Sequence, residues 1–218
     1  LRTACRGAVE DLAKAGAAMN GFERHKITHS SPSQVNTWEN CPALWVVQKL
    51  FHESGARNPA MERGNYVEEA VKEVLLGETL EDATNKVIAA YDTQFVFDAD
   101  GSVEKNRACI APMVAQAVEE LKPYGKPTFN QGKQIQVSTT LAGESWELPV
   151  IGRLDFVFPE HGLIVDLKTT LRAQNVMAAN HQRQRCFYAH AQGNQVVKFL
   201  YVTAKKSLWL EDGNVADE

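Results

Sequence analysis

The sequence predicts an α/β fold, with a central mixed β-sheet flanked by helices and a mainly helical N-terminal part. Up to about residue 122, apolar residues recur at helical spacing, whereas beyond it short segments alternate apolar and polar residues as half-buried strands do. Helices followed by strands, a helix and further strands are typical of a mixed sheet with helices on its faces. We expect a single domain over residues 1–218, with residues 1–122 as its helical part and residues 123–218 as its sheet.

The helical part has clear start and stop signals. Ser31 can cap a helix, Pro32 fits its first position, and Gln34 occupies the capping-box position. The Cys41-Pro42 step should break this helix. Further helices are expected over residues 61–76, ended by Gly77, over residues 80–97 and over residues 103–121.

The sheet part begins after Pro123. Strands are expected over residues 133–141, 146–158, 163–168, 195–203 and 207–210, with a helix over residues 175–192. Pro149 is expected to kink the second strand. The third strand opens with Leu163, Ile164 and Val165, and so apolar a run predicts a central strand that is buried on both faces.

The composition excludes several classes of protein. With 44% hydrophobic and 23% charged residues, the chain is neither disordered, collagen-like nor a coiled-coil rod. No apolar run approaches the roughly 20 residues that span a bilayer, so we expect no membrane association. The four cysteines are scattered and form no C-x-x-C pair, which excludes a zinc ribbon and favours the cytoplasm: Cys5, Cys41, Cys109 and Cys186.

Charge is distributed unevenly along the chain. The whole chain has 23 basic and 27 acidic residues, but residues 122–206 carry eleven Lys and Arg against five Asp and Glu. A basic half on an acidic protein is compatible with an anionic substrate such as nucleic acid. Ordinary solvated surface charge is the alternative interpretation.

Three charged residues fall at suggestive places in the predicted strands. Asp166 and Lys168 lie two apart at the end of the buried strand, so they should share one face while Leu167 turns into the core. Asp155 lies in the preceding strand. Such a group could hold a hard divalent cation and steer a water molecule beside it. The alternative is a structural ion pair.

The helix after this strand adds polar groups. Gln184 and Tyr188 lie four residues apart and therefore on one helical face. Together with Arg185, and with Arg153 in the strand of Asp155, they could contact the phosphates or bases of nucleic acid. A surface helix with its tyrosine in the core is the alternative.

The ordered set of these motifs resembles the RecB-type branch of the PD-(D/E)XK nuclease superfamily, which includes Cas4-like and many phage exonucleases. The resemblance extends from about residue 31 to residue 203. It implies a restriction-endonuclease-like core in which Asp155, Asp166 and the Leu167 carbonyl bind metal and Lys168 is catalytic. It also implies that Gln184 and Tyr188 serve DNA binding and organisation of the site.

The chain departs from that branch in two places. Where a metal-binding His usually follows a Gly by four residues, Gly64 is followed by Glu68, and carboxylate suits Mg²⁺ or Mn²⁺. Glu69 is the rival, but Glu68 shares the apolar stripe of the helix. Cys41 lacks the three downstream cysteines of the iron–sulfur members, so we expect no cluster and a Cys41 thiol packed in the core.

The sequence thus predicts an Mg²⁺- or Mn²⁺-dependent deoxyribonuclease that uses Glu68, Asp155, Asp166 and Lys168. Its expected substrate is single-stranded DNA or DNA with free ends. We expect an exonuclease of replication, recombination or repair in the cytoplasm of a bacterium or a phage-infected cell. Two alternatives remain: an inactive nucleic-acid-binding module of the same fold, and an unrelated α/β protein with a structural Asp–Lys pair.

Overall fold

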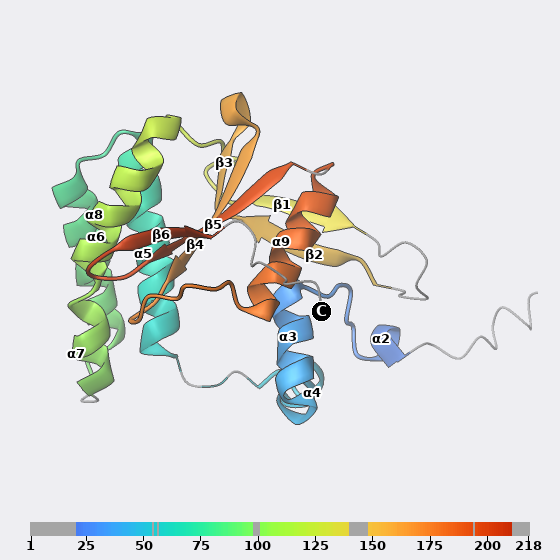
Figure 1. Ribbon diagram of the computed structural model, residues 1–218. Helices are drawn as coiled ribbons and strands as arrows, with labels where there is room; N and C mark the ends of the chain where they lie inside the picture. The colour runs from blue at the N-terminus through green and yellow to red at the C-terminus, as the bar shows by residue number, and fades with distance from the viewer. Residues whose placement is uncertain are drawn as a thin grey trace, which may run out of the picture.

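The computed structural model describes residues 21–53, 55, 57–97, 101–139, 148–193 and 195–210. It confirms the predicted fold class, a mixed sheet with flanking helices (Figure 1). The main sheet has the order β3-β4-β5-β6, in which β4 and β5 are parallel and the outer pairs antiparallel. Strands β1 and β2 form a separate antiparallel pair. The strand bounds are β1 Ile135–Thr139, β2 Val150–Leu154, β3 Phe156–Phe158, β4 Leu163–Thr169, β5 Val196–Val202 and β6 Ser207–Leu210.

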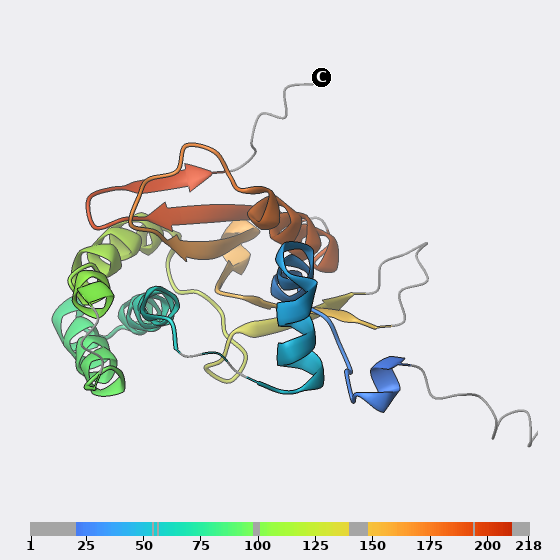
Figure 2. The same ribbon diagram turned by 90° about the horizontal axis from the view of Figure 1, so that it is seen from below.

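The helices fall into two groups that both views separate (Figure 1, Figure 2). One group consists of α5 Pro59–Leu76, α6 Leu80–Gln94, α7 Gly101–Arg107 and α8 Ile110–Leu121. The other comprises α3 Pro32–Asn40, α4 Pro42–Leu50 and α9 Ala179–Ala191, with the short α2 Gly21–Arg24 before them. None of the described helices is both long and apolar enough to cross a membrane.

The start of the first predicted helix is confirmed. The Ser31 hydroxyl accepts the Gln34 N–H at 3.3 Å as the cap of α3, and the chain breaks at Cys41 before α4. The prediction that the Cys41 thiol packs in the core is wrong. Cys41 is exposed, because it is the extended residue (φ −158°) that joins α3 to α4, and neither helix has a buried residue.

Several predicted helix bounds need correction, and α6 ends at Gln94 rather than at residue 97. Helix α5 starts two residues early, because the Asn58 side chain accepts the N–H groups of Ala60 and Met61 as an N-cap. The predicted helix over residues 103–121 is two helices, α7 and α8. The buried Asn106 side chain bonds to the Ser102 carbonyl and to Arg63, which competes with the helical hydrogen bonds at this point.

The second predicted strand is also two strands. The break is not at Pro149, which precedes β2, but at Asp155, which forms the bend between β2 and β3. After this bend the chain leaves β1 and pairs with β4, with Phe156 opposite Val165. The helix expected over residues 175–192 starts only at Ala179.

Burial on the two faces of the sheet confirms the alternation expected in β4. Val165 and Leu167 face the core under α5, α6 and α8, whereas Ile164 lies in the second core, beneath α9. Strand β4 is central, between β3 and β5, as its apolar run predicts. The side chains of Asp166 and Lys168 therefore lie on the α9 face, at the end of a buried strand.

Candidate active site

Three acidic side chains from separate parts of the chain meet at the bend between β2 and β3. The Asp155 Oδ2 atom accepts the Leu167 N–H of β4 at 2.9 Å. The amide nitrogen of Gln134, just before β1, donates to Asp155 Oδ1 at 2.8 Å and to Glu68 Oε1 at 2.7 Å. Asp166 on β4 forms an ion pair with Lys168. The structure thus brings together the acids and the lysine that the sequence singles out.

Helix α5 carries Glu68 to this place because it crosses close to the end of β4. A Cβ atom on Gly64 would lie 3.2 Å from the Thr169 hydroxyl, so the absent side chain permits the close approach. The buried Arg63 guanidinium donates to the Thr169 carbonyl at 3.1 Å and to Asn106 at 2.5 Å. Glu68 follows one turn later and points to the bend, whereas Glu69 is exposed.

Burial raises the pKa values of all three acids, and neighbouring carboxylates raise those of Glu68 and Asp155 further. Burial, then the Asp166 charge, raises the pKa of Glu68 to about 7. Burial, followed by the charges of Asp166 and Glu68, raises the pKa of Asp155 well above its usual range. Burial also raises the pKa of Asp166, against the opposing effect of Lys168. A cation bound among these three carboxyl groups would relieve the repulsion between their charges.

Lys168 remains a cation in this setting. Burial alone would lower the pKa of Lys168, but the charges of Asp166, Asp155 and Glu68 outweigh burial and raise it. Its ammonium lies 5.2 Å from the centre of the Phe199 ring, in a favourable cation–π position. At neutral pH the side chain therefore serves as a positive hydrogen-bond donor rather than as a base.

Helix α9 closes the site from the other side. The Gln184 amide donates to Asp166 Oδ1 at 3.0 Å and to the Tyr188 hydroxyl at 2.8 Å, which confirms that the two residues share a face. The Tyr188 hydroxyl in turn donates to the Arg153 carbonyl at 2.7 Å. The Tyr188 ring is buried against Gly152, so this tyrosine lies in the core while its hydroxyl is bonded to Gln184 and to the Arg153 carbonyl.

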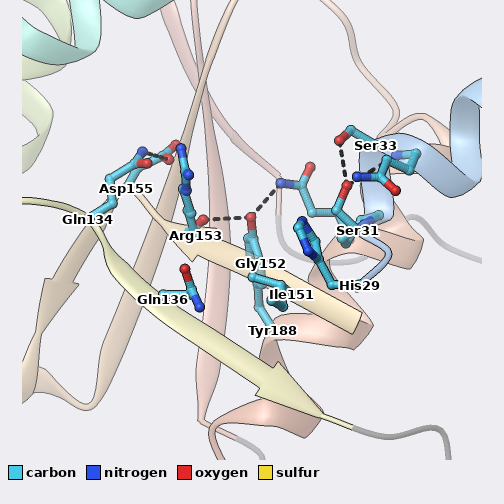
Figure 3. A pocket seen from close by; sticks show the side chains of 13 residues that line it. His29, Ser31, Ser33, Gln134, Gln136, Ile151, Gly152, Arg153, Asp155 and Tyr188 are labelled. Carbon is cyan, nitrogen blue, oxygen red and sulfur yellow. Dashed lines mark hydrogen bonds between the residues drawn. The ribbon is translucent and has the colours of Figure 1, made fainter. Parts of the chain in front are cut away.

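A polar pocket of about 440 Å³ opens at these residues (Figure 3). Asp155 and Gln134 lie at one end, and His29, Ser31 and Ser33, around the start of α3, lie at the other. Of the two arginines that the sequence predicts to contact nucleic acid, Arg153 lines this pocket and Arg185 does not. The remaining lining residues are Pro32, Gln34, Gln136, Ile151, Gly152, Gln184 and Tyr188.

The donor set suits a hard divalent cation, since Glu68, Asp155 and Asp166 offer carboxylate oxygens. Within the described ranges, no three Asp, Glu, His or Cys side chains converge closely enough to hold a metal ion as they stand. Gln134 explains the spacing, because its amide nitrogen lies between Glu68 and Asp155. An N–H₂ group and the Lys168 ammonium supply the positive hydrogens that these acids require.

Gln134 is the residue of this site that the sequence did not single out. Its place in the alternating segment that leads into β1 was a signal that it lies on the less buried side of the strand. That signal could not show its partner, because Glu68 is 66 residues away in the chain. The same holds for Arg63, whose bonds to Asn106 and Thr169 also join distant segments.

The geometry agrees with a comparison against known families. The family model of the PD-(D/E)XK nuclease superfamily matches residues 29–212, a span that contains every residue of the acidic site. The chain belongs to this superfamily. The structure titled "Crystal structure of SSO0001" matches at 12% identity and a TM-score of 0.35, over 70% of this chain and 78% of that one, a likeness too low to support an argument. No curated protein matches the chain.

Proposed function

We propose that this PD-(D/E)XK nuclease superfamily member is an Mg²⁺- or Mn²⁺-dependent deoxyribonuclease of the RecB-type branch, without an iron–sulfur cluster. We propose further that it is an exonuclease acting on DNA ends, in replication, recombination or repair. The observation that carries the proposal is the Lys168 ammonium, which is paired with Asp166 and lies in the field of Glu68 and Asp155, the acid that lines the polar pocket. Nucleic-acid binding alone would require no such set.

Glu68, Asp155 and Asp166 would hold the metal, with the Leu167 carbonyl as a further ligand. The Leu167 N–H donates toward Asp155, and the N–H and C=O of one strand residue point the same way, so this carbonyl faces the acids. Binding would displace the Gln134 amide from between Glu68 and Asp155. When bound, the metal supplies Lewis-acid polarisation of the scissile phosphate and a lowered pKa for a coordinated water.

The chain's own residues orient the reactants. The Lys168 ammonium donates a hydrogen bond to the attacking water and stabilises charge that develops on the phosphate. Gln184 and Tyr188 keep the Asp166 carboxylate in place. The water oxygen bonds to phosphorus as the bond to the 3′ oxygen breaks. The attacking water loses a proton to bulk solvent and the leaving 3′ oxygen takes one up from solvent, which gives a 5′-phosphate and a 3′-hydroxyl.

A cleavage assay tests the proposal with end-labelled linear DNA and covalently closed circular DNA, each single- and double-stranded. We expect hydrolysis of linear DNA in Mg²⁺ or Mn²⁺, none in chelator, and little on circles. Lys168→Ala should lower the rate by at least about a hundredfold, while Lys205→Ala, on an exposed turn, should not. Robust cleavage by Lys168→Ala would remove this lysine from the mechanism, and no cleavage of any substrate would favour a binding module.

The assignment of Glu68 has a matched control in its neighbour. In a calorimetric titration with Mn²⁺, Glu68→Ala should weaken binding and lower activity, whereas the exposed Glu69→Ala should do neither. Glu68→His should keep partial activity with a shift toward Mn²⁺, because imidazole is a softer donor than carboxylate. Equal Mn²⁺ affinity in wild type and Glu68→Ala would exclude Glu68 as a ligand.

A further inference from the structure

A second pocket, of about 620 Å³, adjoins the polar pocket that is lined by Asp155. The two pockets share His29 and Gln34, so a chain molecule could pass from one to the other without leaving the surface. The second pocket is lined mainly by apolar and aromatic side chains: Phe22, Ile27, Val35, Trp38, Trp45 and Leu148, with His29, Ser30, Gln34 and Glu39 as its polar members.

Two tryptophans dominate this second pocket. Their ring centres lie 5.4 Å apart and their planes cross at 87°, which fixes the two rings edge to face. Trp38 is 49% exposed, whereas most other residues of α3 are polar. An aromatic ring that packs against a second ring and is half exposed offers a surface on which a base can stack.

The position of this pocket relative to the acidic site is fixed. Arg183 of α9 donates to Asn36 at 2.8 Å and forms an ion pair with Glu39, both on α3. The next residue of α9, Gln184, holds Asp166. Both views place α3 beside α9 (Figure 1, Figure 2). The aromatic pocket and the acids therefore belong to one connected framework.

We propose that the Trp38 pocket binds an unstacked base of single-stranded DNA, whose sugar–phosphate backbone continues through the polar pocket to the acids. The two linings match the two halves of a nucleotide. Serine and glutamine side chains and Arg153 suit phosphate and sugar, and tryptophan suits a base. A duplex keeps its bases stacked inside, so the pocket selects single strands or unpaired ends. This proposal rests on the proposed nuclease function and adds its substrate class.

The test is the affinity for a labelled twelve-residue thymidine oligonucleotide, measured by fluorescence anisotropy in Ca²⁺ and again in EDTA. Stacking on one aromatic side chain contributes enough that Trp38→Ala should weaken binding about tenfold. Trp38→Phe, which keeps a smaller ring, should lose less and guards against a folding defect. Phe51→Ala is the matched control, because Phe51 is exposed but lines neither pocket, and it should bind like wild type.

An oligonucleotide that lacks a single base gives an independent arm. Moving the abasic position along the strand should locate one position at which the missing base weakens binding to wild type. At that position the missing base should not weaken binding to Trp38→Ala any further. Equal affinity of wild type and Trp38→Ala for the intact strand, or no binding by wild type in either buffer, would overturn the proposal. The proposal would also be overturned if wild type were a dimer, Trp38→Ala were a monomer, and both bound DNA with equal affinity. The pocket would then hold a second copy of the chain.

The outcomes separate this inference from the nuclease proposal. Binding that depends on Trp38, without cleavage of any DNA, would support the base pocket and contradict the nuclease. If the protein cleaves DNA ends but Trp38→Ala binds DNA as tightly as wild type, the nuclease proposal is supported and the base pocket is contradicted.

Discussion

The Asp155 carboxylate accepts a hydrogen bond from the Leu167 N–H, with an N–O distance of 2.9 Å, where a neighbouring strand would otherwise supply a main-chain carbonyl. Strand β3 pairs with β4 only as far as Phe156 opposite Val165. The next outward-pointing N–H of β4, that of Leu167, meets the Asp155 side chain instead of a main-chain carbonyl. The bend that creates the site therefore leaves no unpaired donor there, and it fixes one carboxylate oxygen while the other faces Gln134.

This relationship predicts a variant that folds well and does not cleave. Asp155→Asn keeps an oxygen for the Leu167 N–H but removes an ionisable carboxyl group. Burial and the charges of Asp166 and Glu68 raise the pKa of this group, so its charged form is unfavourable here. In metal-free buffer its melting temperature should stay close to that of wild type, because the relief of charge repulsion offsets the bond lost where the new N–H₂ group faces the Gln134 N–H₂ group. Its cleavage rate should fall by at least about a hundredfold.

Asp92→Asn is the control for that comparison, since it breaks the exposed ion pair with Arg107 and should change neither quantity by much. Thermal unfolding and the DNA cleavage assay measure the two effects. A large loss of stability in Asp155→Asn would show that the carboxylate charge itself holds the bend.

Gln134 should compete with metal for the acids. Gln134→Leu removes the donor that Glu68 and Asp155 share, which should destabilise the metal-free protein by about 1–3 kcal/mol. Added Mg²⁺ or Mn²⁺ should then raise the melting temperature of the variant more than that of wild type. Gln136→Leu, in the same pocket but without a bond to the acids, is the control. An equal metal effect in all three proteins would contradict the competition.

The raised pKa of Glu68 predicts how the stability of the metal-free protein depends on pH. Because burial and the Asp166 charge raise this pKa from 4.5 to about 7, the folded state binds more protons than the unfolded state between these values. The contribution of the protonated Glu68 carboxyl to the free energy of unfolding is therefore fully present below about pH 4.5. It is lost as the pH rises through about 7, and the loss is at most about 3 kcal/mol.

Urea unfolding of wild type and Glu68→Gln at several pH values between 4 and 8, in chelator, checks this dependence. The variant carries a neutral amide at this position, so it should lose less stability than wild type as the pH rises. A parallel pH dependence of the two proteins would show that the Glu68 carboxyl does not titrate in this window.

Local periodicity explains which parts of the site the sequence could predict. Asp166 and Lys168 share a face because strands alternate, and Gln184 meets Tyr188 because residues four apart in a helix lie on one face. Gly64 and Glu68 lie one turn apart for the same reason. Each of these relations is contained within a single element, so the pattern of side chains determines it.

Relations between elements were not accessible in this way. The Asp155 bend depends on the Leu167 N–H in another strand, and the Gln134 bridge depends on α5. Cys41 was expected in the core once an iron–sulfur cluster was excluded, because a free cysteine behaves as a small apolar residue. In the part of the chain that the structure describes, α3 and α4 have no buried residue, so the segment around Cys41 packs on no core. The exposed Trp38 belongs to the same surface.

Gly152 lies so close to the ring of Tyr188 that a larger residue should disturb the site. A Cβ atom on Gly152 would lie 2.5 Å from Tyr188 Cε1 and 2.6 Å from Phe187 Cε1, so Gly152→Ala must displace both rings. Tyr188 cannot move freely, because it is buried and its hydroxyl bonds to the Arg153 carbonyl and to Gln184. Overpacking of this kind costs about 1–3 kcal/mol.

The same displacement should reach the acids, and this distinguishes it from simple destabilisation. When Tyr188 moves, Gln184 loses its partner and with it the hold on Asp166, so cleavage should fall at temperatures where Gly152→Ala is still folded. Gly101→Ala is the matched control, because a Cβ there meets no atom within 4 Å. Melting temperature and cleavage rate, measured together on both variants, check the argument. A Gly152→Ala protein that is destabilised yet cleaves at the wild-type rate would show that Tyr188 packs the core without organising the site.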